Sequence, residues 1–453
     1  MTTAETPIAP DELEALFAPF AGDADRPCAL AVSGGSDSTA LMVLLADWLV
    51  QTKRKPANHV VLTVDHGLRT GSAEEARGVG VAAERLGFRH AVLTWVGAKP
   101  HTAVQEAARG ARYALIAGAM REMRAVSLFT GHTQDDQAET LLMRLARGSG
   151  VDGLSAMASR APLAGFDTGN DGSARDILRP LLAVPKARLR ATLASRGIAW
   201  MEDPSNERSD FERVRLRAAR ADLDALGLSN EVLARSAHRL QRARAVLEAF
   251  TDTFCAPGAT NVTADTLGRI AIDRDALRET GDEIALRVMM RVIRAAGGVQ
   301  APVAYARLET IVAACVSGRR AFPSQTLARA LVTPAPDTIF VEREPGRDPL
   351  PILHLAAGET ATWDGRFRVS VPADFAAGPV EVRALTEPVL LALRRAENCA
   401  PVAGPRIRAA ALVPALWIGD TLAAVPALDY WATVDSRPRT DFIGLSGQGR
   451  GWH

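Results

Sequence analysis

Cysteine is scarce in this chain of 453 residues. The cysteines lie far apart and no two of them form a CxxC pair, so zinc ribbons, iron–sulfur clusters and CxxC redox motifs have no local support. We therefore expect free, buried thiols in the reducing environment of the cytoplasm. The cysteines are Cys28, Cys255, Cys315 and Cys399.

Long hydrophobic runs and an excess of one charge are also missing. No stretch of about 20 uninterrupted apolar residues occurs, so we expect no helix that crosses a membrane. Residues 1–17 contain neither a basic stretch nor an apolar core, which predicts no signal peptide. The formal net charge is +1, so a nucleic-acid partner would have to be held by local basic patches.

Strand and helix patterns alternate through the first half of the sequence. The alternation predicts an α/β fold with a parallel sheet and helices on both faces, in which ligands bind outside the carboxyl ends of the strands. Ser72 and Glu75 fit a capping box, and Gly87 fits a helix stop. The predicted strands are 28–32, 59–66, 90–96, 125–132 and 177–182, and the predicted helices are 38–50, 72–87, 102–123, 134–150 and 185–197.

The second half has a different organisation. Helical periodicity runs through 231–250 and 282–296, and after about residue 345 short runs broken by Gly and Pro predict strands. The Gly- and Asp-rich insert at 163–176 predicts an exposed loop. We expect an α/β domain over 1–222, a helical domain over 223–345 and a small strand-containing domain over 346–453.

A glycine-rich turn, SGGSDS at 33–38, joins the first predicted strand to the first predicted helix. The start of a helix offers unpaired N–H groups to a phosphate, glycines let the backbone approach it, and serine hydroxyls add donors. The lysine of a Walker A loop and the G-x-G-x-x-G pattern of a dinucleotide site are both absent from the turn. A plain strand–helix turn capped by Ser36 or Asp37 is the structural alternative.

Asp37 is an unusual residue for a phosphate loop, because a carboxylate repels phosphate. Its presence is explained if a divalent cation lies between the two groups, since Mg²⁺ is held by one or two carboxylates together with phosphate oxygens. The turn therefore predicts a site for pyrophosphate and magnesium, with Asp37 as the metal ligand.

The SGGSDS turn resembles the SGGxDS signature of the PP-loop ATP pyrophosphatases. This resemblance implies an enzyme that cuts ATP between its α and β phosphates and adenylates a substrate oxygen. It also implies that ATP contacts the whole turn, namely Ser33, Gly34, Gly35, Ser36, Asp37 and Ser38.

Further stretches between residues 28 and 217 resemble the tRNA(Ile)-lysidine synthetase family. The resemblance implies that ATP adenylates O2 of the wobble cytidine in a tRNA(Ile) with a CAU anticodon. The ε-amine of free lysine then attacks C2 and expels AMP, which changes the codon that is read from AUG to AUA. It also implies that the 1–222 domain is catalytic and that the 223–345 domain contacts tRNA. The stretches are VDHGLR at 64–69, ARGARY at 108–113, GHTQDDQAET at 131–140, RGSG at 147–150, RPLL at 179–182 and EDPSN at 202–206.

Two pairs of polar residues outside the turn have expected roles. Asp65 and His66 end the second predicted strand, at the sheet edge where ATP should lie, so they are assigned to ATP positioning, with turn capping as the alternative. Arg109 and Arg112 lie three positions apart and share one helix face. Guanidinium groups suit phosphate, so Arg109 is assigned to ATP and Arg112 to tRNA, unless both form a solvated basic face.

His132 precedes a predicted helix that begins with acidic residues. Asp135 and Asp136 lie four and three positions before Glu139, so Glu139 can share a helix face with either. These carboxylates are predicted to bind the lysine substrate, and one of them or His132 to act as the base for its amine. With Asp37 they form the predicted catalytic set. Carboxylates are also favourable at any helix N-terminus, which is the structural alternative.

Arginines at alternating positions follow the EDPSN stretch. Arg213, Arg215 and Arg217 are assigned to tRNA phosphates, although alternate positions do not all share one helix face. The family has an Arg-Asn-x-x-Arg run here, and Val214 replaces its asparagine.

Three other activities fit parts of the pattern. A PP-loop tRNA thiolase of the 2-thiocytidine type would need cysteines for sulfur transfer or for a cluster. A small-molecule synthetase of the amidotransferase type would need a glutaminase domain. A non-catalytic protein that binds ATP and tRNA would require neither Asp37 nor the acidic cluster.

Overall fold

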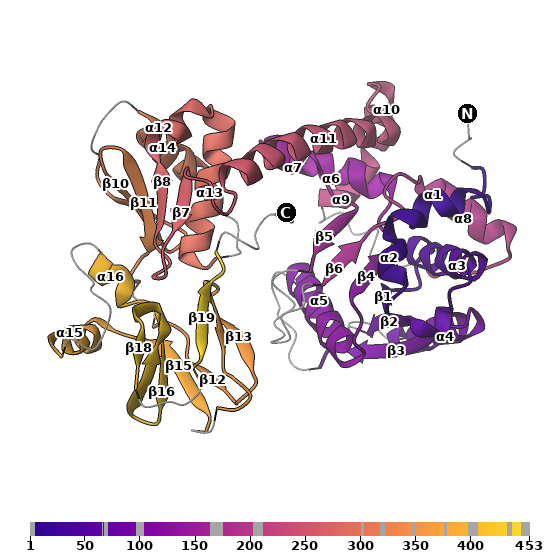
Figure 1. Ribbon diagram of the computed structural model, residues 1–453. Helices are drawn as coiled ribbons and strands as arrows, with labels where there is room; N and C mark the ends of the chain where they lie inside the picture. Colours follow the sequence, from indigo (N-terminus) through magenta and orange to yellow (C-terminus); the bar gives the residue numbers. More distant parts are fainter. Residues whose placement is uncertain are drawn as a thin grey trace. The chain divides into compact units, whose positions relative to one another are not determined.

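The computed structural model describes residues 5–65, 67, 71–96, 104–163, 175–202, 212–299, 303–317, 322–346, 349–375, 378–396, 406–432 and 437–444. The chain forms two compact units, which are described separately (Figure 1). The first comprises residues 1–169 and 173–245, and the second comprises residues 246–450. The division into three domains at residues 222 and 345 stays a prediction.

A six-stranded sheet forms the centre of the first unit, in the order β3-β2-β1-β4-β6-β5. Neighbouring strands pair in parallel, except that β5 runs antiparallel to β6. The predicted parallel α/β fold is therefore confirmed. The strands are β1 (Ala29–Ala31), β2 (Val60–Asp65), β3 (Arg89–Thr94), β4 (Ser127–Thr130), β5 (Arg160–Pro162) and β6 (Asp176–Leu178).

Side chains alternate between the two faces of this sheet, and each face has its own apolar core. Leu30, Val61 and Phe129 belong to a core shared with α3, α4 and α8. Their neighbours Ala29 and Leu128 belong to a second core, shared with α5. Figure 1 shows α5 on one side of the strands and the other three helices on the opposite side. These helices are α3 (Ser36–Gln51), α4 (Ser72–Arg85), α5 (Val104–Glu122) and α8 (Lys186–Ser195).

The segment that precedes β1 holds α8 in place. Arg188 of α8 is buried, and its Nε donates to the Thr6 carbonyl at 2.9 Å. Its Nη2 and Nη1 donate to the two carboxylate oxygens of Glu12 at 2.7 and 3.0 Å. The Ile8 N–H donates to Thr192 Oγ1 of α8 at 2.8 Å. Residues 6–12 therefore anchor α8 through both backbone and side-chain contacts.

A second group of helices surrounds α6 (Gln134–Ala146). Leu233 and Ala237 of α11 pack against Ala138 and Leu141 of α6. The boundary between the two units, after Ala245, lies within α11. The remaining helices of the group and of the N-terminal segment are α1 (Glu12–Phe17), α2 (Ala21–Ala24), α7 (Val151–Leu154), α9 (Glu212–Ala218), α10 (Arg220–Ala225) and α11 (Asn230–Phe254).

The start of α4 differs from the prediction. Gly71, with a φ of 95°, is the N-cap residue, and Ser72 Oγ instead donates to Asp65 Oδ1 at 2.7 Å. The predicted capping box of Ser72 with Glu75 is therefore wrong, because the carboxylate at the end of β2 takes the serine hydroxyl. Gly87, with a φ of 83°, follows the end of the helix as predicted.

The second unit contains a five-stranded antiparallel sheet in the order β7-β8-β11-β10-β9, with an apolar core shared with α13 and α14. The predicted helices at 231–250 and 282–296 are present as α11 and α13. The sequence pattern does not predict the sheet, because its strands do not alternate one by one with helices as those of the first unit do. These elements are β7 (Val262–Ala264), β8 (Ile270–Asp273), α12 (Arg274–Glu279), α13 (Asp282–Gly297), α14 (Tyr305–Val316), β9 (Gln325–Leu327), β10 (Ala330–Pro334) and β11 (Thr338–Arg343).

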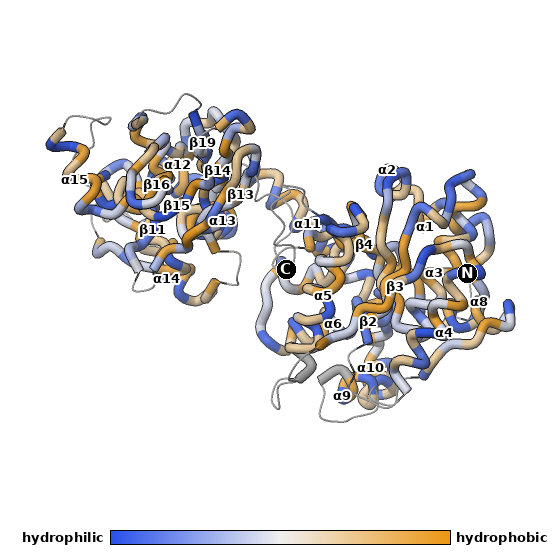
Figure 2. The backbone as a smooth tube through the Cα atoms, turned by 90° about the horizontal axis from the view of Figure 1, so that it is seen from below, coloured by the Kyte–Doolittle hydropathy of each residue, from blue (hydrophilic) through white to orange (hydrophobic). Residues whose placement is uncertain are grey.

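The strands predicted after residue 345 are confirmed as two further sheets, β12-β15-β16-β17-β18 and β13-β14-β19. Trp363 and Phe367 lie in their shared core. Figure 2 shows polar and apolar residues alternating along the chain in both units, as half-buried elements require. The elements are β12 (Leu353–Leu355), β13 (Thr360–Trp363), β14 (Phe367–Ser370), β15 (Val380–Ala384), α15 (Glu387–Arg395), α16 (Arg406–Ala410), β16 (Pro414–Ile418), β17 (Thr421–Val425), β18 (Tyr430–Trp431) and β19 (Arg439–Phe442).

The described cysteines are free and buried, as predicted. Burial raises the pKa of Cys28 and of Cys315 to about 12, and that of Cys255 to about 11. Cys399 lies outside the described residues. Among the helices that the structure describes, none has the length and apolar character needed to cross a membrane.

Candidate active site

The turn between β1 and α3 is held together by serine hydroxyls. Ser38 Oγ accepts a hydrogen bond from the Ser33 N–H at 3.2 Å and donates to the Gly35 carbonyl at 3.1 Å. Gly35, rather than Ser36 or Asp37, is the N-cap residue, and no side chain of the described residues caps this helix. The N–H groups in the first turn of α3 are therefore not capped, as an anion site requires.

Two glycines permit close packing around the turn. Gly34 has a φ of 89°, and a Cβ atom there would lie 2.7 Å from Met201 Sδ. Gly131 follows β4, and a Cβ atom there would lie 2.8 Å from the Asp37 carbonyl oxygen. The end of β4 and the first turn of α3 are thus in direct backbone contact, which brings the residues after Gly131 next to Asp37.

Asp37 lies in the first turn of α3 and forms an ion pair that the sequence pattern does not predict. Its Oδ2 lies 3.1 Å from Lys186 Nζ, and its Oδ1 accepts a hydrogen bond from Ser36 Oγ at 3.0 Å. Burial raises the pKa of Asp37, and the charge of Asp136 raises it further, whereas the Lys186 ammonium lowers it. The net direction is upward, so the site disfavours an uncompensated negative charge on Asp37.

The N-terminus of α6 is capped by its own acidic residue. The Thr133 N–H donates to Asp136 Oδ2 at 2.8 Å, and the Asp136 N–H donates to Thr133 Oγ1 at 3.4 Å, which together form a capping box. His132 Nδ1 and Thr130 Oγ1 lie 2.9 Å apart and form a hydrogen bond. The capping arrangement fixes the Asp136 carboxylate at the end of β4.

Asp135 joins three helices through its carboxylate. Its Oδ2 accepts a hydrogen bond from the Lys186 N–H at 2.8 Å, at the start of α8. Its Oδ1 accepts one from Asn230 Nδ2 at 2.8 Å, at the start of α11. Asn230 Oδ1 in turn accepts a hydrogen bond from Arg220 Nη1 at 2.5 Å. Asp135 therefore positions the walls of the site.

Glu139 is buried and pairs with Arg217 of α9. The hydrogen bond to Glu139 raises the pKa of Arg217, and the charges of Asp136 and Asp37 act in the same direction. This guanidinium therefore lies in the field of three carboxylates.

One cavity of about 290 Å³ collects these side chains. It contains both the carboxylate of the glycine-rich turn and the carboxylates of α6, so a phosphate ligand and an amine ligand can meet in it. Its lining residues are Asp37, Thr133, Asp135, Asp136, Glu139, Leu142, Lys186, Arg190, Leu216, Arg217, Arg220 and Asn230.

Comparison with known proteins identifies the family. Residues 6–221 match the PP-loop domain family. The tRNA(Ile)-lysidine synthase of Bradyrhizobium sp. (strain BTAi1) is 42% identical over 360 residues, which cover 75% of this chain and 96% of that relative. The chain belongs to the tRNA(Ile)-lysidine synthase family. Relatives of the same name from Methylobacterium sp. (strain 4-46) and Brucella canis are 44% and 34% identical over 312 and 437 residues, covering 68% and 91% of this chain and 86% and 88% of theirs.

Several residues predicted for a tRNA(Ile)-lysidine synthase site are not among those lining the cavity. Asp65 Oδ1 accepts hydrogen bonds from the Gly67 N–H at 2.9 Å and from Ser72 Oγ, so the turn after β2 uses this carboxylate. The guanidinium carbon of Arg109 lies 5.1 Å from the ring centre of Tyr113. Arg112 is exposed on α5.

The remaining predicted residues fall at the limits of the described chain. His66 lies outside the described residues, as do residues 164–174 of the loop predicted at 163–176, whereas Asp176 begins β6. Arg213 is in α9, but its side chain also lies outside them, whereas Arg215 is exposed on the same helix.

Several cavity residues have no assignment from the sequence, among them Lys186, Arg190 and Asn230. Lys186 and Asn230 contact Asp135 across 51 and 95 residues of sequence, so no local spacing links them. For Lys186 one signal exists: it begins a predicted helix just after a strand of the parallel sheet, at the edge where ligands bind.

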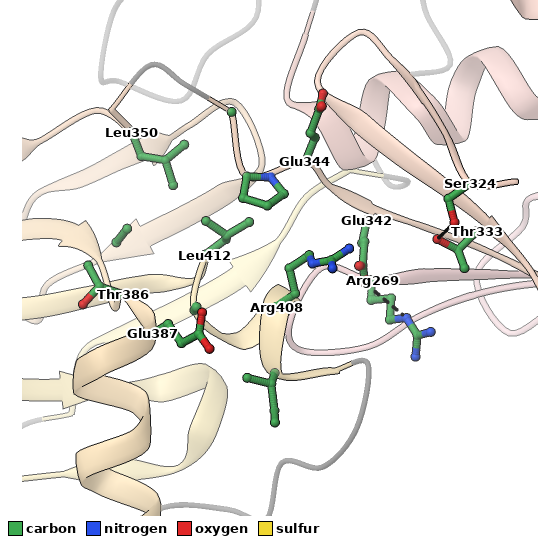
Figure 3. Close-up of a pocket in the computed structure, with 15 residues that line it drawn as sticks. Arg269, Ser324, Thr333, Glu342, Glu344, Leu350, Thr386, Glu387, Arg408 and Leu412 are labelled. Atoms are coloured by element: carbon green, nitrogen blue, oxygen red, sulfur yellow. Dashed lines mark hydrogen bonds and ion pairs between the residues drawn. The ribbon is translucent and has the colours of Figure 1, made fainter.

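A second cavity, of about 680 Å³, lies in the second unit (Figure 3). Arg269 Nε lies 3.4 Å from Glu342 Oε2, and its guanidinium stacks 3.6 Å from the ring centre of Phe340. Burial raises the pKa of Glu342, while the charges of Arg269 and Arg408 lower it. The cavity therefore has charges of both signs, and it contains none of the site residues predicted from the sequence.

Proposed function

We propose that this chain uses ATP to join free lysine to C2 of the wobble cytidine in a tRNA(Ile) with a CAU anticodon. Membership of the tRNA(Ile)-lysidine synthase family supports this reaction. The observation that carries it is the shared cavity, in which Asp37 of the glycine-rich turn meets the acidic residues of α6.

The reaction has two steps with a common intermediate. First, O2 of the cytidine attacks the α-phosphate of ATP, an O2–P bond forms and pyrophosphate leaves. Second, the ε-amine of lysine attacks C2, AMP departs with O2, and the attacking nitrogen gives up its proton. The uncapped N–H groups of α3 would hold the phosphates in the first step, and the hydroxyls of Ser33, Ser36 and Ser38 would rotate from their partners in the turn to donate to them.

Magnesium fits this donor set when ATP supplies most of its ligands. The described residues contain no group of three or more His, Cys, Asp or Glu side chains that could hold a metal alone. Asp37 offers the one carboxylate that Mg²⁺ can take from a protein when phosphate oxygens supply its other ligands. Bound there, the ion would neutralise charge on the phosphates.

We assign the lysine amine to Asp136, which becomes the proposed base. Both oxygens of Glu139 accept hydrogen bonds from Arg217, and both oxygens of Asp135 accept hydrogen bonds from Lys186 and Asn230. Thr133 binds only Oδ2 of Asp136, so in the described part of the chain Oδ1 keeps its capacity to accept a proton from the amine.

The tRNA phosphates are assigned to Arg112, Arg213 and Arg215, which are not among the residues lining the described cavity. Arg112 and Arg215 are exposed, and Arg213 lies one helical turn before Arg217 on α9. Arg217 itself is reassigned to the lysine side of the cavity, because its guanidinium binds Glu139. The cytoplasm is the proposed location of the enzyme.

The test is incorporation of labelled lysine into RNA. The purified full chain is incubated with ATP, magnesium, radiolabelled lysine and a tRNA(Ile) transcript with a CAU anticodon. We expect labelled tRNA together with equal amounts of AMP and pyrophosphate. A transcript with a GAU anticodon, which lacks the wobble cytidine, is the control and should remain unlabelled.

Absence of lysine incorporation with the CAU transcript would contradict the proposal. Incorporation of sulfur under thiolation conditions would support the 2-thiocytidine alternative instead. None of the described cysteines lines the cavity, so no specific observation favours that alternative.

A further inference from the structure

Lys186 is an exception in a chain whose basic residues are nearly all arginine. Lysine and arginine together number 53, and only four of these are lysine. The other basic residues that line the described cavity are Arg190, Arg217 and Arg220. Where only a positive charge is needed, this chain mostly uses arginine. We therefore ask which property of lysine, absent from arginine, position 186 requires.

That property is a compact charge on a flexible stem. The backbone of Lys186 is fixed, because its N–H donates to Asp135 Oδ2 at 2.8 Å and Arg188 anchors the same helix. Its ammonium lies 3.1 Å from Asp37 Oδ2, and its side chain is 33% exposed. The ammonium can thus leave Asp37 by rotation of the four-carbon stem while the Cα atom stays in place.

We propose that Lys186 is a positioning residue of the ATP-using step, whose ammonium holds Asp37 in the free enzyme and yields this carboxylate to magnesium when ATP binds. The inference rests on the proposed function, which assigns the metal to Asp37. One carboxylate oxygen does not hold an ammonium and a divalent cation together without strong repulsion between the two. The released ammonium then lies within reach of the phosphates at the turn.

Arginine at this position would behave differently. A guanidinium can grip both carboxylate oxygens in a fixed fork, so it would hold Asp37 against the metal. A lysine makes a single point contact and competes less strongly. Lys186→Arg should therefore weaken metal binding, whereas Lys186→Gln should strengthen it.

The first test measures metal binding without catalysis. Mn²⁺ is titrated into the full-length protein saturated with α,β-methylene ATP, whose α–β phosphate link is not cleaved, and enzyme-bound Mn²⁺ is followed by electron paramagnetic resonance. In Lys186→Gln we expect Mn²⁺ to bind about two- to fivefold more tightly than in the wild type, the effect of removing a partly exposed ion pair. A purely structural defect would not tighten binding.

The second readout is pyrophosphate release at saturating ATP. Lys186→Gln should slow it by about ten- to a hundredfold, because a charged hydrogen bond to phosphate is lost. Arg190→Gln is the matched control: it removes a positive charge one turn further along α8, from a residue that pairs with Glu202 at 3.4 Å. Its effect on Mn²⁺ affinity should be smaller than that of Lys186→Gln.

Unchanged or weaker Mn²⁺ binding in Lys186→Gln would overturn the inference. If that variant does not fold, Lys186→Arg provides the test. Unchanged or tighter Mn²⁺ binding in Lys186→Arg would contradict the proposal that the metal replaces the Lys186 ammonium at Asp37. The Mn²⁺ readout does not require lysine or tRNA, so it stays informative if the proposed function fails. If the wild type incorporates lysine but both variants have unaltered Mn²⁺ affinity, the role of Lys186 is contradicted while the proposed function stands.

Discussion

Arg217 binds both carboxylate oxygens of Glu139, from Nε to Oε1 at 2.6 Å and from Nη2 to Oε2 at 3.3 Å. The two residues are 78 positions apart, on α9 and α6. Glu139 is buried, so it depends on this arginine for compensation of its charge. The pair makes α9 a wall of the cavity, so an arginine predicted to bind tRNA lies beside the carboxylates that are proposed to bind lysine.

A double-mutant cycle tests this pair. Glu139→Gln and Arg217→Met should each raise the KM for lysine, because each leaves a partly buried group without its partner. The double variant should be less impaired than the sum of the two effects predicts, with a coupling energy of about 0.5–3 kcal/mol. The measurement is lysine KM in the incorporation assay. Strictly additive effects would mean that the pair does not act as a unit.

Asp136→Asn tests the proposed base. Asparagine can still cap α6 through its carbonyl oxygen, so the fold should be retained, but it cannot accept a proton. We expect lysine incorporation to fall by about a hundredfold or more, in the range typical of general-base removal. Pyrophosphate release in the absence of lysine should fall far less. Equal losses in both assays would exclude a role confined to the amine.

Asp37→Asn separates ATP chemistry from RNA binding. Pyrophosphate release should drop by at least about a hundredfold, because the site loses a charge that organises the phosphates. Affinity for the tRNA transcript, measured by filter binding, should change less than about twofold. Asp47→Asn is a control on the same helix, where Asp47 pairs with Arg196 at 2.5 Å outside the cavity. Normal pyrophosphate release in Asp37→Asn would contradict the metal assignment.

The salt dependence of tRNA binding distinguishes neighbouring arginines of α9. Arg215 is exposed, and its replacement by alanine should reduce the slope of log K against log salt by about one. Arg217 is engaged by Glu139, so Arg217→Ala should leave that slope nearly unchanged. The reverse order of the two slopes would return Arg217 to the tRNA site.

His59 gives the first unit a pH-dependent stability. Burial lowers the pKa of His59 to about 4, and the charges of Arg89 and Arg54 act in the same direction. The unfolded chain, with an ordinary histidine pKa, therefore binds the proton first as the pH falls. Stability contributed by neutral His59 is complete above about pH 6.5 and is lost towards pH 4.

Urea denaturation at pH 7.5 and pH 5.0 measures this effect. Between these values the wild type should lose about 2 kcal/mol more of its free energy of unfolding than His59→Asn, which does not titrate. His59→Asn is expected to be less stable at pH 7.5, because its shorter side chain disturbs the bond from the Cys28 N–H to His59 Nδ1. An identical pH dependence in both proteins would contradict the prediction.

Local pattern predicts the first unit well, and long-range contacts explain the failures. The strands around Leu30 and Val61 are continuous apolar runs, and their helices have clear periodicity. The local pattern predicts that Ser72 caps its own helix, but Asp65 at the end of β2 accepts the hydrogen bond from its hydroxyl. The strands of the β7–β11 sheet do not alternate one by one with helices, so the pattern that predicts the first sheet is absent from this part of the sequence.

The candidate site divides in the same way. The SGGSDS turn and the acidic start of α6 are contiguous in sequence and can be identified there. Lys186 and Asn230 lie next to the turn and the start of α6 only because the first residues of α8 and α11 contact Asp135 in the folded chain. Residues that are so far apart in the sequence follow no regular spacing, so a single sequence does not reveal that they are in contact.

The contacts between residues 6–12 and α8 have a consequence for shortened forms of the chain. Arg188, two positions after Lys186, is held by Thr6 and Glu12. A deletion of residues 1–12 removes no residue that lines the cavity. It would, however, remove the contacts that hold α8, the helix that carries Lys186. Removal of the N-terminal segment should therefore displace Lys186 in the cavity, although the segment itself lies outside it. The catalytic rate of a shortened form should be measured as well as its expression yield.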